Sequence, residues 1–368
     1  MLFRKGIPRK SVMSVRGLLL SWGGLLLITL VVISLASPDA FSTVRAFFIT
    51  PWSSPWFVGN LLDLFSLYLL TSLGVTMAFV GGTFNLGGEA QMYWGGILAS
   101  LVLLRFPEGS SPFLSLLLAS LVAAGIGALL GSVSGVLKRF YGADELITTF
   151  LLSLAVTPIG DYLLSGPLRD PAGNLLATPR FAPERRLPLL LPPSSLNVSL
   201  VIAFGMLGII LFFLYRTGWG YRYRIGGASP AFSRYGGNDP AAMILPSLTV
   251  SGAFHGLAGF CAVAGTAGLC HQGFSGGIGW TAITVALVAR TIPLALVPSA
   301  LLFAWLKTGS EIAQLQGSLD MDAATLIQAL VLLLVTVQIR GDLAERLEKF
   351  LKGFPFDRWK RSPGGTTK

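Results

Sequence analysis

Apolar runs of membrane-spanning length recur along the whole chain, and they restrict its possible folds more than any other feature. The runs 17–36, 61–80 and 112–136 are clear examples. About 20 apolar residues of helix cross the hydrocarbon core of a bilayer. Charged residues make up only 12% of the chain, about half the fraction usual in soluble domains. Because the alternating ten-residue strands of an outer-membrane barrel are not seen, the sequence predicts an all-α, polytopic membrane helical bundle.

Basic residues gather beside the apolar runs and predict the orientation of the chain. Residues 1–16 carry five basic and no acidic side chains, and residues 340–368 carry eight basic and four acidic ones. The loop 216–239 is the most densely basic internal segment. Since Lys and Arg favour the cytoplasmic side, we expect all three in the cytoplasm. The same bias explains the net charge of +10 better than nucleic-acid binding does.

Two cytoplasmic termini require an even number of crossings, and about ten transmembrane segments satisfy this requirement. Two of the ten are shorter than an ordinary span, but merging them would place the basic tail outside, against the charge bias. The arginine-rich segment 166–195 falls outside by the same count. The predicted segments are 17–36, 61–80, 89–104, 112–136, 144–165, 196–215, 240–269, 281–290, 293–307 and 323–339.

A polar, glycine-rich break interrupts the apolar pattern between the second and third predicted spans, from Gly81 to Gln91. Each glycine disfavours helix by about 1 kcal/mol relative to alanine. A polar break at lipid depth is tolerated where protein buries it or where it lines a wet cavity. The break is therefore a candidate transport pathway. Its structural residues are predicted to be Gly81, Gly82, Gly87, Gly88 and Glu89, with Phe84, Asn85 and Gln91 lining the pathway.

Two of these roles have alternatives. Glu89 begins the third predicted span, so its carboxylate fits a structural role at the positive end of that helix better than a place in the pathway. For Asn85 and Gln91 the alternative is a structural bend in which their amides bond to neighbouring helices. The pathway interpretation is favoured for both.

A second glycine-rich break, Cys270–Trp280, follows the seventh predicted span. Discontinuous helices in paired positions point to a substrate site in membrane transporters. His271, Gln272 and Phe274 are the candidate lining residues of this break. They fit a contact with a substrate-delivering protein equally well.

The first break also carries a family resemblance. Phe84–Gln91 reads Phe-Asn-Leu-Gly-Gly-Glu-Ala-Gln, which closely resembles the FNIGGEGQ signature of nucleoside permeases in ABC importers. These belong to the wider branched-chain amino acid and simple-sugar permease family, which also holds riboflavin permeases. Ala90 departs from the signature, where a glycine is usual. The resemblance extends over about 61–339, through the similar segments 144–147, 165–171, 225–237 and 278–290.

The predicted spans place the transmembrane domain at residues 17–339, and the resemblance implies that it is an importer permease in a bacterial inner membrane. The expected substrate is a small polar aromatic solute, first a nucleoside, with riboflavin or a simple sugar as alternatives. Expected partners are ATP-hydrolysing subunits, a second permease chain, identical or similar, and an extracytoplasmic binding protein, either a lipoprotein or periplasmic. Since the chain lacks a phosphate-binding loop, we expect neither enzyme activity nor a cofactor.

The loop 216–239 is predicted to couple this permease to its ATPase. Ser229 and Pro230 make a good helix start, and the two following glycines at 236 and 237 make a good stop. Arg234 and Tyr235 are expected to face the ATPase. The alternative is an ordinary basic loop at the membrane surface.

An ATP-independent secondary transporter is the second hypothesis. It would need intramembrane carboxylates for a coupling ion, and most of the available ones, Asp63, Glu89, Asp161 and Glu311, lie near span ends. A metal site is not expected, because the two histidines, His255 and His271, are isolated.

Overall fold

The computed structural model describes residues 30–31, 33, 37–107, 109–316 and 329. The chain divides into two compact units, one of residues 42–317 and one that joins 1–41 with 318–368. Nearly all described residues belong to the first unit. The predicted spans 17–36 and 323–339 fall almost entirely outside the described residues, as do the predicted cytoplasmic segments 1–16 and 340–368.

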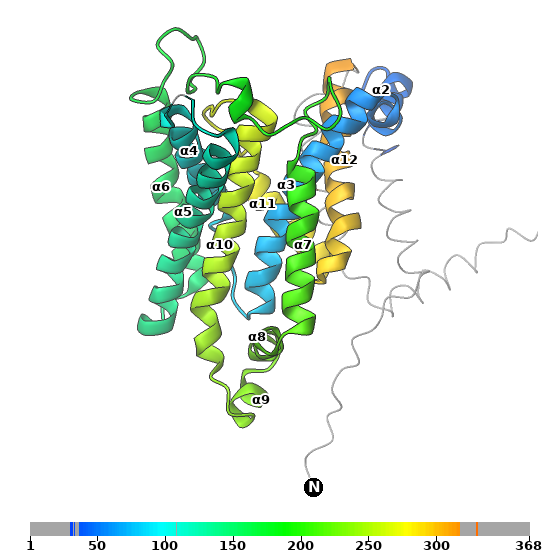
Figure 1. Cartoon of the computed structure of the whole chain (residues 1–368). Helices are drawn as coiled ribbons and strands as arrows, with labels where there is room; N and C mark the ends of the chain where they lie inside the picture. The colour runs from blue at the N-terminus through cyan, green and yellow to red at the C-terminus, as the bar shows by residue number, and fades with distance from the viewer. Residues whose placement is uncertain (1–29, 32, 34–36, 108, 317–328, 330–368) are drawn as a thin grey trace, which may run out of the picture. The chain divides into compact units, whose positions relative to one another are not determined.

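The described chain is helical, as predicted, and its only β pairing consists of two isolated bridges. Figure 1 shows α8 and α9 at one end of the helices and the long loop between α6 and α7 at the opposite end. We call these the α9 end and the loop end. The elements are α2 (Ala40–Phe48), η1 (Thr50–Trp52), α3 (Pro55–Val80), α4 (Gly88–Arg105), α5 (Pro112–Tyr141), α6 (Glu145–Ser165), η2 (Pro183–Arg185), α7 (Ser199–Arg216), α8 (Gly218–Ala228), α9 (Pro230–Tyr235), η3 (Pro240–Met243), α10 (Ile244–Cys261), η4 (Ala262–Ala267), α11 (Ile278–Val288), η5 (Pro293–Ala295) and α12 (Leu296–Gln316).

Five described helical segments are long and apolar enough to cross a membrane: α3, α5, α6, α7 and the continuous run Pro240–Ala267. The segments Ile278–Val288 and Pro293–Gln316 qualify together as a sixth, although the chain bends by 119° between them. The described residues therefore give five or six candidate spans, and the predicted ten are not confirmed. α4 matches a predicted span closely but does not qualify, because Glu89 and Gln91 make its first turns polar.

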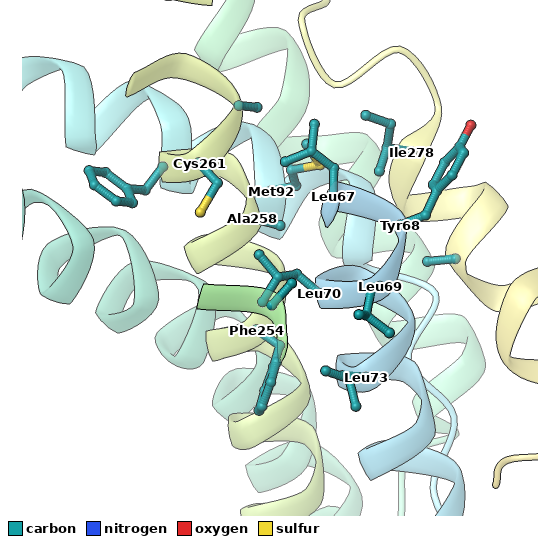
Figure 2. Close-up of a cluster of buried hydrophobic side chains, with 14 of the residues drawn as sticks. Leu67, Tyr68, Leu69, Leu70, Leu73, Met92, Phe254, Ala258, Cys261 and Ile278 are labelled. Atoms are coloured by element: carbon teal, nitrogen blue, oxygen red, sulfur yellow. The ribbon is translucent and has the colours of Figure 1, made fainter. Parts of the chain in front are cut away.

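Two of the candidate spans, α3 and Pro240–Ala267, occupy the centre of the bundle. Within their most apolar windows 89% and 78% of the residues are buried, against 17–28% for α5, α6 and α7. The last three helices expose large apolar side chains, as a lipid-facing surface requires. Figure 2 shows the centre, where Leu67, Leu70 and Phe254 belong to a buried cluster with Met92 and Ile278.

Glycines hold α5 and α10 in close contact. A Cβ atom at Gly252 would lie 2.0 Å from the carbonyl oxygen of Gly127, and one at Gly256 would lie 2.0 Å from that of Ala123. Only glycine permits this approach of two helix backbones, which is a common way to pack helices in a membrane. The glycines of α10 thus allow its close packing on α5.

Candidate functional site

The first break lies between α3 and α4, and a compact amide network closes it. The Nδ2 group of Asn85 donates to Gln91 Oε1 at 2.8 Å and to Ser251 Oγ at 2.9 Å. Its Oδ1 atom accepts from the N–H of Gly87 and from Gln91 Nε2. Asn85 and Gln91 are almost completely buried. In this conformation the polar groups of the break are satisfied by its own side chains, by α10, and by the Thr149 hydroxyl of α6, which accepts the N–H of Leu86.

Helix α8 packs directly on the start of the first break. The hydroxyl of Tyr223 donates to the carbonyl of Met77 at 2.7 Å, in the last turn of α3. A Cβ atom at Gly82, whose φ is +80°, would lie 2.8 Å from the Cα of Gly227. Burial raises the pKa of Tyr223, so its hydroxyl keeps the proton that it donates. The short helix α9, which follows α8, is thereby connected to the break.

Glu89 joins the two breaks. Its carboxylate accepts hydrogen bonds from the N–H groups of Gly277 at 3.0 Å and Gly279 at 2.9 Å. Gly277 is the N-cap of α11, and Gly279 lies in the first turn of that helix. The structural role predicted for Glu89 therefore has a partner that the sequence did not indicate. The carboxylate stands at the start of α4 but caps the start of α11.

The second break is held to the loop between α6 and α7 by a ladder of backbone hydrogen bonds. Thr178 N–H donates to Cys270, Phe181 N–H to Gly268, and Gln272 N–H to the carbonyl of Leu176. Leu187 N–H extends the ladder to Ala264. This part of the loop and the second break thus form one structural unit at the loop end.

Two neighbouring cavities open beside this unit. The outer cavity, of about 740 Å³, lies between the loop, the start of α3 and η4. The inner cavity, of about 490 Å³, lies between α3, the second break and α12. Both volumes fall in the range of small-molecule sites. Trp56, Asn60, Ser195 and Thr266 line both cavities.

The inner cavity combines aromatic and charged side chains. Tyr68 and Phe274 line it together with Asp63, Lys307 and Glu311. Lys307 Nζ lies 3.4 Å from Glu311 Oε1, one turn further along α12. Asp63 is buried and accepts a hydrogen bond from Asn197 Nδ2 at 2.9 Å. A planar solute with polar edges finds both ring faces and hydrogen-bonding groups here.

The structure separates the residues predicted to line a pathway. Phe274 lines the inner cavity, where its ring stacks on Tyr93 at 5.3 Å. His271 and Gln272 lie on the ladder and line neither cavity, and Gln272 is exposed. Asn85 and Gln91 also line neither cavity. Phe84 is half-exposed and packs on Phe79.

Sequence reasoning missed Trp56, Asn60, Ser195 and Lys307 as cavity residues. Trp56 and Asn60 precede the predicted span 61–80, and Lys307 is the last residue of the predicted span 293–307, so all three were assigned to the edges of spans. In the structure α3 begins at Pro55 and α12 continues to Gln316. A signal did exist, since Asn60 and Asp63 lie one turn apart, as do Lys307 and Glu311.

The predicted helix 230–235 is confirmed in the loop 216–239. Ser229 is the N-cap of α9, and its side chain accepts from the N–H of Phe232. Gly237, at φ +76°, stands just beyond the end of the helix. Arg234 is exposed, and Tyr235 is 94% exposed at the α9 end of the bundle. The surface of α9 is thus open to a partner.

Comparison of the sequence with known proteins shows the family to which this chain belongs. The family model described as branched-chain amino acid transport system, permease component, matches residues 57–336. A probable riboflavin import permease of Treponema pallidum is 37% identical over 83% of this chain and 81% of its own. A glucose ABC transporter permease of Haloferax volcanii is 27% identical, over 79% and 77%. A guanosine ABC transporter permease of Bacillus subtilis is 28% identical, over 76% and 81%. No solved structure matches the chain.

Proposed function

We propose, from the premise that this chain belongs to the family of branched-chain amino acid transport system permeases, that it imports riboflavin. The coarser statement, a permease of the ABC importers for nucleosides, sugars and riboflavin, rests on the family and on its relatives. The substrate is our proposal. The 37% identity with the Treponema pallidum permease over most of both chains carries it.

The inner cavity supports a flavin-like substrate. A flavin presents a broad planar ring for aromatic faces such as those of Tyr68 and Phe274. Its polyol chain suits the carboxylates and the ammonium group of Asp63, Glu311 and Lys307. We propose that the inner cavity belongs to the half of the pathway nearer the loop end.

A purine nucleoside is the second candidate, because the chain is also 28% identical to a guanosine permease and the Phe84–Gln91 octapeptide resembles that of nucleoside permeases. A nucleoside shares with riboflavin a planar ring and a polyhydroxyl group. Both would use the same cavity.

Asn85, Gln91 and Phe84 are proposed to line the inner part of the pathway in a second conformation. In the described one, the amide network buries them. Opening this network requires that the start of α4 move away from α10. Since α8 contacts Met77 and Gly82 beside the break, a displacement of α9 by an ATPase has a direct route to it.

The proposed assembly joins this chain to three partners. ATPase subunits dock at α9 through Arg234 and Tyr235, which face outward there. A second permease chain and an extracytoplasmic binding protein complete the importer in the inner membrane. The α9 end then faces the cytoplasm and the loop end faces outward.

Uptake by the complete importer tests the proposal. The permease, its ATPase and its binding protein are reconstituted in proteoliposomes and supplied with labelled riboflavin or labelled guanosine. We expect ATP-dependent uptake of riboflavin that excess guanosine does not reduce. Uptake of guanosine alone would favour the second candidate, and riboflavin uptake that proceeds without the ATPase would contradict an ABC importer.

A further inference from the structure

The two cavities share four lining residues, which we call the seam. Of the four residues that line both cavities, Trp56 and Asn60 come from the first turns of α3, Ser195 from the loop and Thr266 from η4. These side chains therefore lie where the outer cavity borders the inner one.

A pair of hydrogen bonds closes this seam. Asn60 Oδ1 accepts from the backbone N–H of Ser195 at 2.9 Å and from its hydroxyl at 3.0 Å. One helical turn further along, Asn197 Nδ2 donates to Asp63 Oδ1 at 2.9 Å and to the carbonyl of Ser195 at 2.9 Å. Residues 188–198, which we call the arm, are thus joined to α3 by hydrogen bonds to the side chains of Asn60 and Asp63.

The arm packs closely on α3 where it is attached. A Cβ atom at Gly59 would lie 2.0 Å from Ser194 Oγ. The absence of a side chain at Gly59 lets the arm approach until Ser195 reaches Asn60. This approach leaves little room for a solute at the seam.

We infer that Asn60 and Ser195 form the outer gate of the import pathway, with the arm as its moving part. The inference rests on the proposed function, because a gate needs a solute pathway on both sides. The preceding part of the loop is tied to the second break by backbone hydrogen bonds up to Leu187, so it stays in place when the arm moves.

The strength of the closure suits a gate. A hydrogen bond between neutral groups adds only modestly to stability, because the same groups bond to water when they separate. Two such bonds between Asn60 and Ser195 hold the seam closed but leave it open to displacement by a bound solute or partner. The arm keeps its own shape during the movement, because Leu190 N–H donates to Leu196 and Val198 N–H to Pro188 within it.

A reversible cross-link tests the gate in the complete importer. Asn60→Cys and Ser195→Cys are introduced together and joined with a short bifunctional methanethiosulfonate reagent. Native Cys261 and Cys270 are buried, so the reagent should not reach them. We expect the riboflavin uptake rate of the cross-linked protein to fall at least tenfold and to recover after the cross-link is reduced. Full cross-linking with unchanged uptake, or no cross-link at all, would overturn the inference.

A matched control ties the same loop at a point away from the seam. Arg185 Nη2 donates to the carbonyl of Pro107 at 3.1 Å, and neither residue lines a cavity. The pair Pro107→Cys and Arg185→Cys, joined by the same reagent, should keep its uptake rate within about twofold. An equal loss of uptake in this control would show that any tether of the loop stops transport, and the specific gate would be rejected.

A second measurement separates the gate from the choice of substrate. Thr308 lines the inner cavity, so Thr308→Cys reports access to it by a water-soluble thiol reagent applied at the loop end. Adding Asn60→Ala should raise the labelling rate about fivefold or more, whereas Pro107→Ala should not. If the wild-type importer takes up neither riboflavin nor guanosine, the substrate proposal fails. The labelling rate of Thr308→Cys still tests the gate, because it does not depend on the substrate. Unchanged labelling would reject the gate.

Discussion

The carboxylate of Glu89 accepts the N–H of Gly279 at 2.9 Å across 190 residues of sequence, and so connects the start of α4 to the start of α11. The backbones also touch there, since a Cβ atom at Gly279 would lie 2.4 Å from the amide nitrogen of Glu89. Two helix starts, each with a positive end, therefore share one negative charge. The two breaks form one joint rather than two independent bends.

Removing this carboxylate should loosen the joint. Hydrogen bonds to charged groups contribute about 1.5–3 kcal/mol, so Glu89→Ala should lower the free energy of unfolding by about that amount. Glu89→Gln keeps one acceptor oxygen and should lose less. Thermal unfolding of the purified protein in detergent measures both changes. The exposed Glu184→Ala is the control and should stay within about 0.5 kcal/mol of wild type. Equal stability of Glu89→Ala and wild type would contradict the role.

A methyl group at position 88 should be poorly tolerated. A Cβ atom at Gly88 would lie 2.5 Å from Nε2 of the buried His255, and overpacking of this kind costs about 1–3 kcal/mol. We expect Gly88→Ala to lower the melting temperature of the purified protein. Gly125→Ala in α5, where nothing lies within 4 Å of the added atom, should be neutral or slightly stabilising. A neutral Gly88→Ala would show that His255 can move aside.

Asn85→Leu should reduce uptake at equal membrane abundance. The substitution removes the donor and the acceptor of the network, and leaves the amide of Gln91 and the hydroxyl of Ser251 buried without this partner. Each orphaned group costs about 1–3 kcal/mol. Ser251→Ala removes one bond only and is the graded control. Uptake by Asn85→Leu at the wild-type rate would overturn the proposed place of Asn85 in the pathway.

Reversing the charge on α9 should uncouple ATP hydrolysis from transport. If Arg234 meets the ATPase, Arg234→Glu places a repelling charge in that interface and should reduce uptake at least about tenfold, equivalent to 1.4 kcal/mol. ATP hydrolysis should continue without solute stimulation. Uptake and hydrolysis are measured in the same proteoliposomes. Arg139→Glu is the charge-matched control, because Arg139 is exposed and lies in the last turn of α5. Coupled transport by Arg234→Glu would remove α9 from the coupling role.

Local signals predicted much of the helical framework. The predicted span 144–165 matches α6, and the side chain of Asp144 caps this helix by accepting from the N–H of Leu146. The Ser229-Pro230 start of α9 is confirmed as well. These features depend on residues within one helical turn of each other, so the sequence displays them directly.

Long-range partnerships could not be predicted in the same way. Asn60 contacts Ser195 across 135 residues, and Glu89 contacts Gly279 across 190. No local periodicity encodes such a pairing. Polar residues such as Lys307 were interpreted as the end of a span, because hydropathy alone does not distinguish a cavity wall from a membrane boundary. The candidate site therefore came from the structure, although several of its residue types were visible in the sequence.

The contact of Tyr223 with Met77 sets an energetic threshold for the whole proposed cycle. The carbonyl of Met77 also accepts the N–H of Gly81, so separation costs only the hydrogen bond of the Tyr223 hydroxyl. Such a bond contributes about 0.5–1.5 kcal/mol net, which corresponds to about a twofold to twelvefold bias against the separated state. Small thermal excursions of α8 would then be resisted, and only a partner that supplies more than this energy would displace it. In the proposed importer, the hydroxyl of this one tyrosine would oppose leakage of solute while no ATPase is working.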